Sequence, residues 1–362
     1  MAGTVHLTRG PDKAAAIEEL ARVCGGRVGL VGVLEDLNRA GRPAYAPGTA
    51  VEWAFRWDRE DSLSRRWWPQ GITTSADAGA GTGGPGAPEE RYAGRAVALT
   101  TSYSKDLDGL AKGCRISVAD VTDPDRVRYR HVLLVEAVLD DLGEVDLRPV
   151  RAHAGGVVWS GRHLHVAATA KGLHTFDVND VVRVEVTGRP DLLGPQPDGR
   201  VAGYGHRYVL PARWTHTASA AGATALRYSF VSLSHGPSPE LLAGEYGRGD
   251  MTTRLVRFPV DPDGLPAADD VAVTTPELLG VGGVQQMQGA VLVDGRLHVT
   301  TSNGRFRRGS LWTGTTRLER HARTLPVGPE DISWWPSTDR LWSLTEYPGS
   351  RMVFTLDRSR FG

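Results

Sequence analysis

Cysteine is scarce in this sequence, which contains only Cys24 and Cys114 among 362 residues. Two cysteines cannot build a disulfide framework or a four-cysteine zinc site. The chain also lacks an apolar run of about 18 residues, so we expect no membrane-spanning helix. Its first residues lack the basic-then-apolar pattern of a secretory signal peptide. We therefore expect a cytoplasmic protein.

A surplus of either charge is absent too, because 42 Lys and Arg balance 42 Asp and Glu. This balance favours neither nucleic acid nor an anionic membrane as a partner. The sequence contains no P-loop, no Gly-x-Ser-x-Gly motif and no dinucleotide fingerprint after a strand. A small-molecule substrate is the partner that remains, and the sequence does not indicate the oligomeric state.

Helical periodicity is limited to residues 11–24, where Pro11 suits a first turn and Gly25 can end a helix. We interpret residues 1–48 as an N-terminal helix and loop extension. From residue 49 to 362, short runs of β-branched and aromatic residues alternate with Gly, Pro, Asp and Asn. This pattern predicts a single all-β domain.

A repeated frame runs through the β region. It consists of a polar residue, a short apolar strand, a tight turn, a second strand of the form Leu-x-Val or Leu-x-Ser, a loop and a third strand. Its five copies begin at Gln70, His153, His216, Gln288 and Glu330. Because such meanders bury their apolar faces by radial stacking, the repeat predicts a five-bladed β-propeller. A two-sheet sandwich, the alternative, leaves the recurring polar residue unexplained.

A fourth strand, on the outside of the repeat, can follow four of the copies, at 129–138, 207–214, 270–275 and 321–327. The last copy has none before Gly362. The alternating segment 51–57 (VEWAFRW), just before the first copy, is the natural donor. We therefore predict that residues 51–57 pair beside residues 351–357 and close the ring.

The polar residue that enters each innermost strand should face the central funnel. We expect Glu330 to act as an acid or base and His153 and His216 to transfer protons, while Gln70 and Gln288 orient the substrate. If a divalent metal ion is bound, these two histidines and Glu330 would hold it. Further candidate substrate-binding residues are Trp68, Tyr103, Trp214, Asp331, Trp335 and Glu346. The alternative is that the polar residues only line a water-filled channel.

Other patterns are weaker. His163 and His165 share one face of a strand, but they lie in the second strand of a repeat. A paired-carboxylate glycosidase would need a second acid beside Glu330, taken from Asp77, Asp331 or Glu346. A ligand- or carbohydrate-binding propeller without catalysis and a protein-interaction scaffold also stay open. The five unlike entry residues favour one central site over repeated equal sites.

Four segments, at 68–78, 129–136, 150–159 and 329–336, resemble a group of actinobacterial proteins known mainly as uncharacterised or secreted. That group brings no assigned reaction, and the resemblance suggests a role in specialised metabolism. A looser resemblance to propeller lactonases and cyclases implies a site in the funnel. We accordingly expect cyclisation, hydrolysis or elimination of a small organic molecule there, by acid/base or metal-assisted chemistry.

Overall fold

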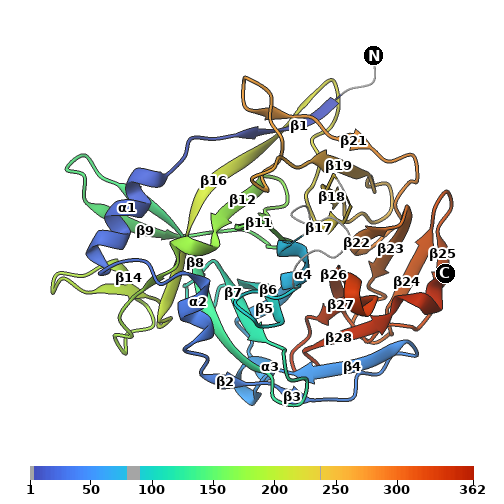
Figure 1. Ribbon diagram of the computed structural model, residues 1–362, viewed down its shortest axis with the longest axis horizontal. Coiled ribbons are helices and arrows are strands. Elements are labelled where there is room, and N and C mark those ends of the chain that lie inside the picture. Colours follow the sequence, from blue (N-terminus) through green and yellow to red (C-terminus); the bar gives the residue numbers. More distant parts are fainter. Residues whose placement is uncertain (1–3, 80–89, 237) are drawn as a thin grey trace.

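The computed structural model describes residues 4–79, 90–236 and 238–362, and this part of the chain is mostly β-strand (Figure 1). Its strands are short because β-branched and aromatic runs end at turns rich in Gly, Pro and Asp. The α-helices within these ranges are α1 (Ala14–Val23), α2 (Gly29–Leu34), α3 (Arg59–Leu63) and α4 (Ser75–Ala78). None of them is long and apolar enough to cross a membrane. The all-β prediction is confirmed.

Antiparallel meanders follow one another along the chain, and each begins with a strand near the middle of the molecule (Figure 1). These first strands are β5 (Trp67–Thr74), β10 (Val157–Ser160), β17 (Phe230–Ser234), β22 (Met287–Val293) and β26 (Pro329–Trp335). Contacts join β5 to β10, β10 to β17, β17 to β22, β22 to β26 and β26 back to β5. The first strands thus form a closed ring, and the arrangement is propeller-like.

The later strands of each meander pair outward from the ring in sequence order. They are β6 (Val97–Ser104), β7 (Cys114–Asp120) and β8 (Arg128–Leu139); β11 (His163–Ala167), β12 (Gly172–Asp177) and β16 (Tyr208–Ala221); β18 (Glu240–Gly244), β19 (Leu255–Pro259) and β21 (Glu277–Leu278); β23 (Arg296–Thr301), β24 (Ser310–Gly314) and β25 (Glu319–His321); β27 (Arg340–Thr345) and β28 (Met352–Asp357).

The last meander takes its fourth strand from the other end of the chain. Strand β4 (Val51–Arg56) pairs antiparallel with β28, with Phe55 opposite Val353 and Ala54 opposite Phe354. Strand β3 (Arg42–Pro43) adds outside β4. The predicted pairing of residues 51–57 beside residues 351–357 is therefore confirmed.

The first two meanders are not separate sheets. The outer strands β8 and β16 pair in parallel through Val209 with Leu133 and Pro211 with Val135, which merges them into a 13-stranded sheet. The predicted outer strand at 270–275 is wrong, because β20 (Val273–Thr274) pairs with β1 (Thr4–Arg9) and β21 occupies the outer position. The outer strand expected at 321–327 is β25, which ends at His321.

Residues before 49 form more than a helix and loop. Strand β1 pairs with β16 over six residues, and α1 packs against β8, β9 and β16. The predicted helix at 11–24 is present in a shorter form, and α2 follows it. The remaining short elements are β2 (Arg39–Ala40), β9 (Val145–Pro149), β13 (Val182–Arg183), β14 (Leu193–Pro195), β15 (Val201–Gly203), η1 (Val178–Asp180), η2 (Pro336–Thr338) and η3 (Arg358–Phe361).

The ring of first strands is tight, and glycine allows it. A Cβ added to Gly71 in β5 would lie 2.7 Å from the carbonyl carbon of Gly156. A Cβ on Gly156 would lie 2.3 Å from the amide nitrogen of Val231 in β17. Neighbouring backbones leave no room for a side chain there. The glycines beside the polar entry residues therefore set the width of the ring.

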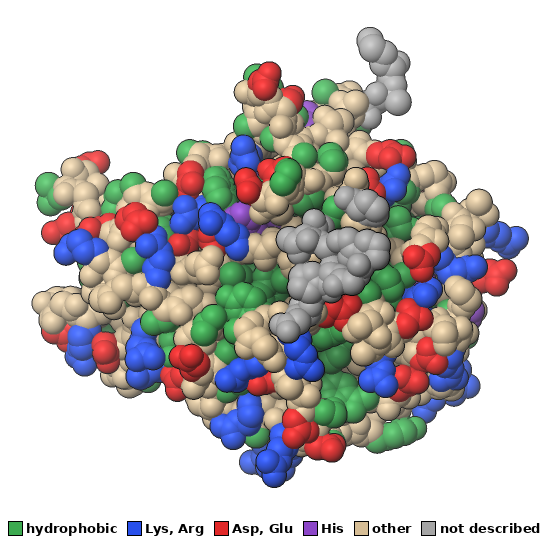
Figure 2. Space-filling model, viewed as in Figure 1, with side chains coloured by type: hydrophobic (Ala, Val, Ile, Leu, Met, Phe, Trp, Pro, Cys, Tyr) green, Lys and Arg blue, Asp and Glu red, His purple; other side chains and the backbone are tan. Residues whose placement is uncertain are grey.

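Apolar side chains fill the spaces between neighbouring meanders. Between the first and the last, Phe55, Trp57, Tyr129 and Trp342 are buried together. Trp57 packs edge-on against Tyr129, with ring centroids 4.8 Å apart. On the outside, acidic and basic side chains are interspersed over the face shown in Figure 2. This surface agrees with the balanced composition.

Candidate active site

A cavity of about 850 Å³ opens at one end of the ring. Four of the predicted entry residues line it: Gln70, His153, Gln288 and Glu330. Ser229, which directly precedes β17, lines it as well. Residues far apart in the sequence thus converge because each one enters a first strand. The volume is in the range that holds a small molecule.

Irregular pairing between the first and second strands determines the direction of three of these side chains. The register between the first and second strand shifts between Pro69 and Ile72, between Met287 and Gly289, and between Pro329 and Ile332. Such β-bulges redirect a side chain that regular pairing would point elsewhere. Gln70, Gln288 and Glu330 lie inside these three shifts, and Gly71 and Asp331 are the other residues enclosed.

A pair of carboxyl groups forms the most unusual feature of the cavity. Glu330 is 3% exposed, and its carboxyl hydrogen-bonds to that of Glu346, just after β27. Gln288 Nε2 donates to Glu330 Oε1 at 3.1 Å, and Gln70 Nε2 donates to Glu346 Oε2 at 3.4 Å. Each carboxyl therefore has an amide that orients it. Two adjacent carboxyl groups share a proton more readily than both ionise.

Burial is the main cause that raises the pKa of Glu330 well above its usual range, and the charges of Glu346 and Asp331 add to it. Burial also raises the pKa of Glu346, although hydrogen bonds from Tyr347 and Gln70 partly oppose the rise. Glu330 is therefore the carboxyl that keeps its proton to a higher pH than an ordinary glutamate does. A carboxylic acid kept protonated in a cavity can serve as a general acid.

His153 and Tyr103 form a second titratable pair at the same place. Their rings lie 4.6 Å apart, centroid to centroid. Protein surrounds His153 although its side chain is accessible to the cavity, and this partial burial lowers its pKa. Burial, together with the charges of Glu346 and Glu330, raises the pKa of Tyr103 to about 12. At neutral pH a neutral imidazole, which can accept a proton, thus lies beside a neutral phenol.

Trp68 supports the Glu346 side of the cavity without lining it. Its ring meets Tyr347 edge-on at 6.2 Å, and Lys105 Nζ lies 3.4 Å from its ring centroid. Arg351, which is 1% exposed, donates from Nε to the Glu346 carbonyl oxygen at 2.7 Å. These contacts fix the segment that carries Glu346.

Four predicted site residues do not line the central cavity, namely His216, Trp214, Trp335 and Asp331. His216 is wrong as an entry residue, because it lies in outer strand β16, fully buried, where its Nδ1 is 3.1 Å from Thr175 Oγ1. Trp214, also in β16, packs against His163 with ring centroids 5.4 Å apart. Trp335 lines a different pocket, with Trp53 and Trp342.

Asp331 points away from the cavity. Its carboxylate oxygen Oδ2 accepts from the backbone N–H of Ile72 at 3.1 Å and of Val157 at 3.4 Å. It therefore ties β26 to β5 and β10. Burial raises its pKa well above the usual range. The role of Asp331 in this structure is to hold the ring together.

Within the described ranges, no three His, Cys, Asp or Glu side chains form a group that could hold a metal ion. The proposed ligand set of His153, His216 and Glu330 does not come together, because His216 is on the wrong strand. His163 and His165 do not form a metal-binding group either; each hydrogen-bonds to a backbone carbonyl, of Asp263 and Gly264 respectively.

Asp77, also considered from the sequence, meets His235 near the middle of the ring. Asp77 Oδ1 accepts from His235 Nε2 at 2.7 Å, and Oδ2 accepts from Thr73 Oγ1 and Ser333 Oγ at 2.6 and 2.8 Å. The short helix α4 that carries Asp77 contacts β10 and β26 (Figure 1). Neither residue lines the central cavity.

Sequence reasoning missed the basic side chains around the cavity. They are Arg151, Lys171, Arg227 and Arg248. They come from loops, where no strand periodicity indicates position. It also missed Ser229, for which a signal existed: the segment after it, FVSLS, alternates as a strand, and a polar residue stands just before it.

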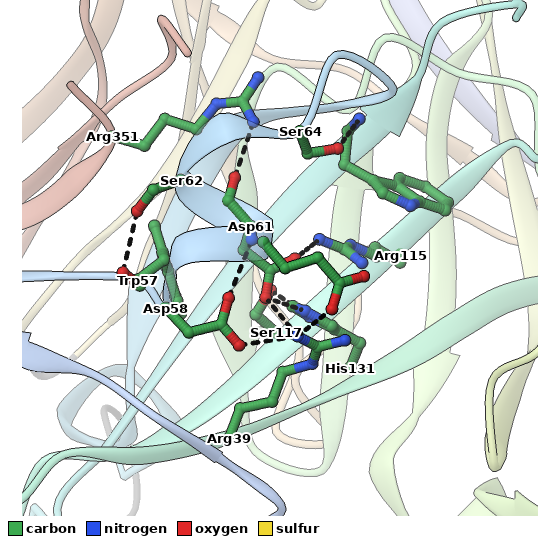
Figure 3. A network of polar contacts seen from close by, with 12 residues as sticks. Arg39, Trp57, Asp58, Asp61, Ser62, Ser64, Arg115, Ser117, His131 and Arg351 are labelled. Carbon is green, nitrogen blue, oxygen red and sulfur yellow. Dashed lines mark hydrogen bonds and ion pairs between the residues drawn. The ribbon is translucent and has the colours of Figure 1, made fainter. Parts of the chain in front are cut away.

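A second buried polar cluster lies between the first and last meanders (Figure 3). At its centre is Asp61 in α3, which accepts from Arg115 at 2.7 Å and from Tyr129 Oη at 2.7 Å and lies 2.8 Å from His131 Nε2. Burial alone would raise the pKa of Asp61, but the interactions with His131 and with the guanidinium groups of Arg115 and Arg39 outweigh it and hold the pKa well below its usual range. The void beside the cluster is only about 10 Å³, so a ligand does not fit.

No family model and no curated protein sequence matches the chain. Among solved structures, similar chains include an RS223 β-xylosidase (9% identity, TM-score 0.35, 72% of this chain and 87% of that one). A GH43_1 enzyme from Xanthomonas citri is 9% identical with a TM-score of 0.37, and the match covers 81% of this chain and 89% of that one. The β-propeller domain of Cps50 from Myceliophteria thermophila is 14% identical with a TM-score of 0.32, and the match covers 73% of this chain and 80% of that one. At these scores the likeness supports no conclusion about activity.

Proposed function

We propose that this protein is a five-bladed β-propeller enzyme that acts on a small organic molecule by general acid–base catalysis in its central cavity. The closed ring of first strands supports the five-bladed arrangement. The observation that carries the proposed activity is Glu330, a buried carboxyl with a raised pKa that lies beside Glu346 in the lining of the central cavity.

In this proposal Glu330 donates its proton to the atom that leaves or accepts charge and becomes a carboxylate beside Glu346. Repulsion between the two carboxylates then favours reprotonation of Glu330 by the proton that His153 takes up, which restores the starting state. His153, neutral at working pH, is placed to take a proton from the substrate or from water. Gln70 and Gln288 hold the two carboxyl groups in position. Cyclisation, hydrolysis and elimination all need such a donor and acceptor, and a role in specialised metabolism remains part of the proposal.

The test is the variant Glu330→Gln, compared with Glu319→Gln, an exposed carboxyl in β25. The parent protein is incubated with panels of lactones, glycosides and uronides, and products are detected by mass spectrometry. Loss of an acid catalyst should slow turnover by about 10²- to 10⁴-fold, while Glu319→Gln should have no effect. Retained turnover in Glu330→Gln would reject the role.

A substrate-free measurement supports the same test. Infrared difference spectra at neutral pH should show the band of a protonated carboxyl that disappears in Glu330→Gln and persists in Glu319→Gln. If the band is absent from the parent protein, Glu330 is ionised and cannot be the acid. A ligand that binds in the cavity without any turnover would instead favour the non-catalytic binding propeller.

A further inference from the structure

The charges around the central cavity are unevenly distributed. Three of its basic side chains, Arg151, Lys171 and Arg248, form no hydrogen bond or ion pair with any described residue. Arg248 makes one cation–π contact within the described part of the chain, in which its guanidinium carbon lies 5.4 Å from the ring centroid of Tyr246. All three side chains are exposed at the cavity mouth. They are cations without counterions.

Arg227 differs from these three residues. It donates from NH2 to the Thr252 carbonyl oxygen at 2.8 Å and lies 3.9 Å from Glu245, so its charge is largely offset. The acidic residues that line the cavity are Glu330 and Glu346. The three unpaired cations outnumber these two carboxyl groups. The lining of the cavity therefore carries an excess of positive charge in a chain of zero net charge.

The cations also lie on one side. Arg151 comes from the loop between β9 and β10, Lys171 from the loop between β11 and β12, and Arg248 from the loop between β18 and β19. The carboxyl pair comes from β26 and from the loop after β27. A bound molecule can thus place one end against the cations and another against the acid. Clefts of one sign concentrate ligands of the opposite sign.

We infer that the substrate is an anion, which carries a carboxylate or phosphate group that binds to Arg151, Lys171 and Arg248 while its reacting part reaches Glu330. This inference rests on the proposed function and names the substrate class of the same site. Arginine suits both kinds of group, because its guanidinium can form two parallel hydrogen bonds to either. Neutral substrates would leave the three cations without a role.

The experiment measures binding rather than turnover, in the Glu330→Gln background, so that it is independent of catalysis. Three molecules with one skeleton are titrated calorimetrically: galacturonate, galactose 6-phosphate and galactose. We expect at least one of the two anions to bind at least tenfold more tightly than galactose. Tighter binding of galacturonate would indicate a carboxylate site, and tighter binding of galactose 6-phosphate would indicate a phosphate site.

A matched pair of triple variants locates the effect. Replacement of Arg151, Lys171 and Arg248 by Gln should abolish the preference for the anion. Replacement of Arg307, Arg317 and Arg323 by Gln removes the same charge from exposed positions outside the cavity and should leave the preference intact. Raised salt should weaken anion binding to the parent cavity.

The inference is overturned if galactose binds as tightly as both anions, if neither anion gives saturable binding, or if the two triple variants behave alike. None of these results bears on the acid role of Glu330, which the turnover and infrared measurements test separately. Conversely, anion binding with unchanged turnover in Glu330→Gln would reject the acid and keep the anion site.

Discussion

Glu330 and Asp61 are both buried carboxyl groups, yet their surroundings give them opposite states. Asp61 lies among Arg115, His131 and Tyr129, and the pKa of its carboxyl is held well below the usual range. Glu330 faces another carboxyl and two amides, and its pKa is raised well above the usual range. The Asp61 cluster has almost no free volume, whereas Glu330 faces a cavity of about 850 Å³. Burial alone therefore does not identify a catalytic acid; the charge and the space around the carboxyl do.

Replacement of each carboxyl by its amide should show the difference between Asp61 and Glu330 most clearly, and the larger effect is expected at Asp61. In Asp61→Asn, a neutral amide replaces the carboxylate and leaves buried Arg115 without its counterion. Breaking a buried ion pair in this way typically costs about 3–5 kcal/mol. Urea unfolding followed by tryptophan fluorescence should show that loss in the free energy of unfolding. A loss below about 1 kcal/mol would mean that Asp61 does not hold the two meanders together.

Acid should destabilise the protein through three buried histidines, His131 of the Asp61 cluster and His165 and His174 of the second meander. Burial, reinforced by the charge of Arg115, lowers the pKa of His131 to about 4, and burial likewise lowers those of His165 and His174 to about 4. Between pH 6.5 and about 4 the unfolded chain binds protons that the folded chain excludes. Stability is therefore fully present above pH 6.5 and should fall by about 1.4 kcal/mol per pH unit for each histidine.

The measurement is a series of urea unfolding curves from pH 7.5 to 4.5. The variant His165→Asn should have a shallower slope than the parent, since one proton fewer is taken up on unfolding. Stability that is constant across this range would contradict the assignment of these histidines as neutral in the folded protein.

Glu330→Gln should give the smallest effect on stability, and in the opposite direction. Since the folded pKa of Glu330 is raised, its contribution is fully present below the unfolded pKa near 4.5 and is lost as the pH rises. An amide resembles the protonated acid in shape and carries no such penalty. At pH 7 the variant should be as stable as the parent or more so. A loss of about 3 kcal/mol, equal to that expected for Asp61→Asn, would show that Glu330 is ionised.

Sequence periodicity predicted much of the fold and part of the site. The alternation of residues 51–57 and the lack of a fourth strand in the last repeat were enough to predict the β4–β28 pairing. The polar residues at or near the starts of β5, β10, β22 and β26 were found because each precedes a recognisable apolar run. His216 was chosen wrongly because β16 is long and alternates like a first strand, so the frame began one strand too early.

Other features leave no local signal in the sequence. Asp61 and Arg115 are 54 positions apart, and neither position is marked by periodicity. Glu346 and Arg151 lie in loops, whose paths depend on tertiary packing rather than on alternation. The parallel pairing of β8 with β16 joins two outer strands whose patterns fit an edge equally well. Only their three-dimensional arrangement shows that these residues meet.

The pairing of β4 with β28 also has a consequence for biosynthesis. When β4 leaves the ribosome, its partner is still about 300 residues from being made, which takes roughly 15 to 60 seconds at ordinary rates of translation. During that interval the edge of Val51–Arg56 that pairs with β28 has no partner, and the apolar side chains of Phe55 and Ala54 are not yet covered by β28. The nascent chain therefore carries an unsatisfied strand until β28 has been made.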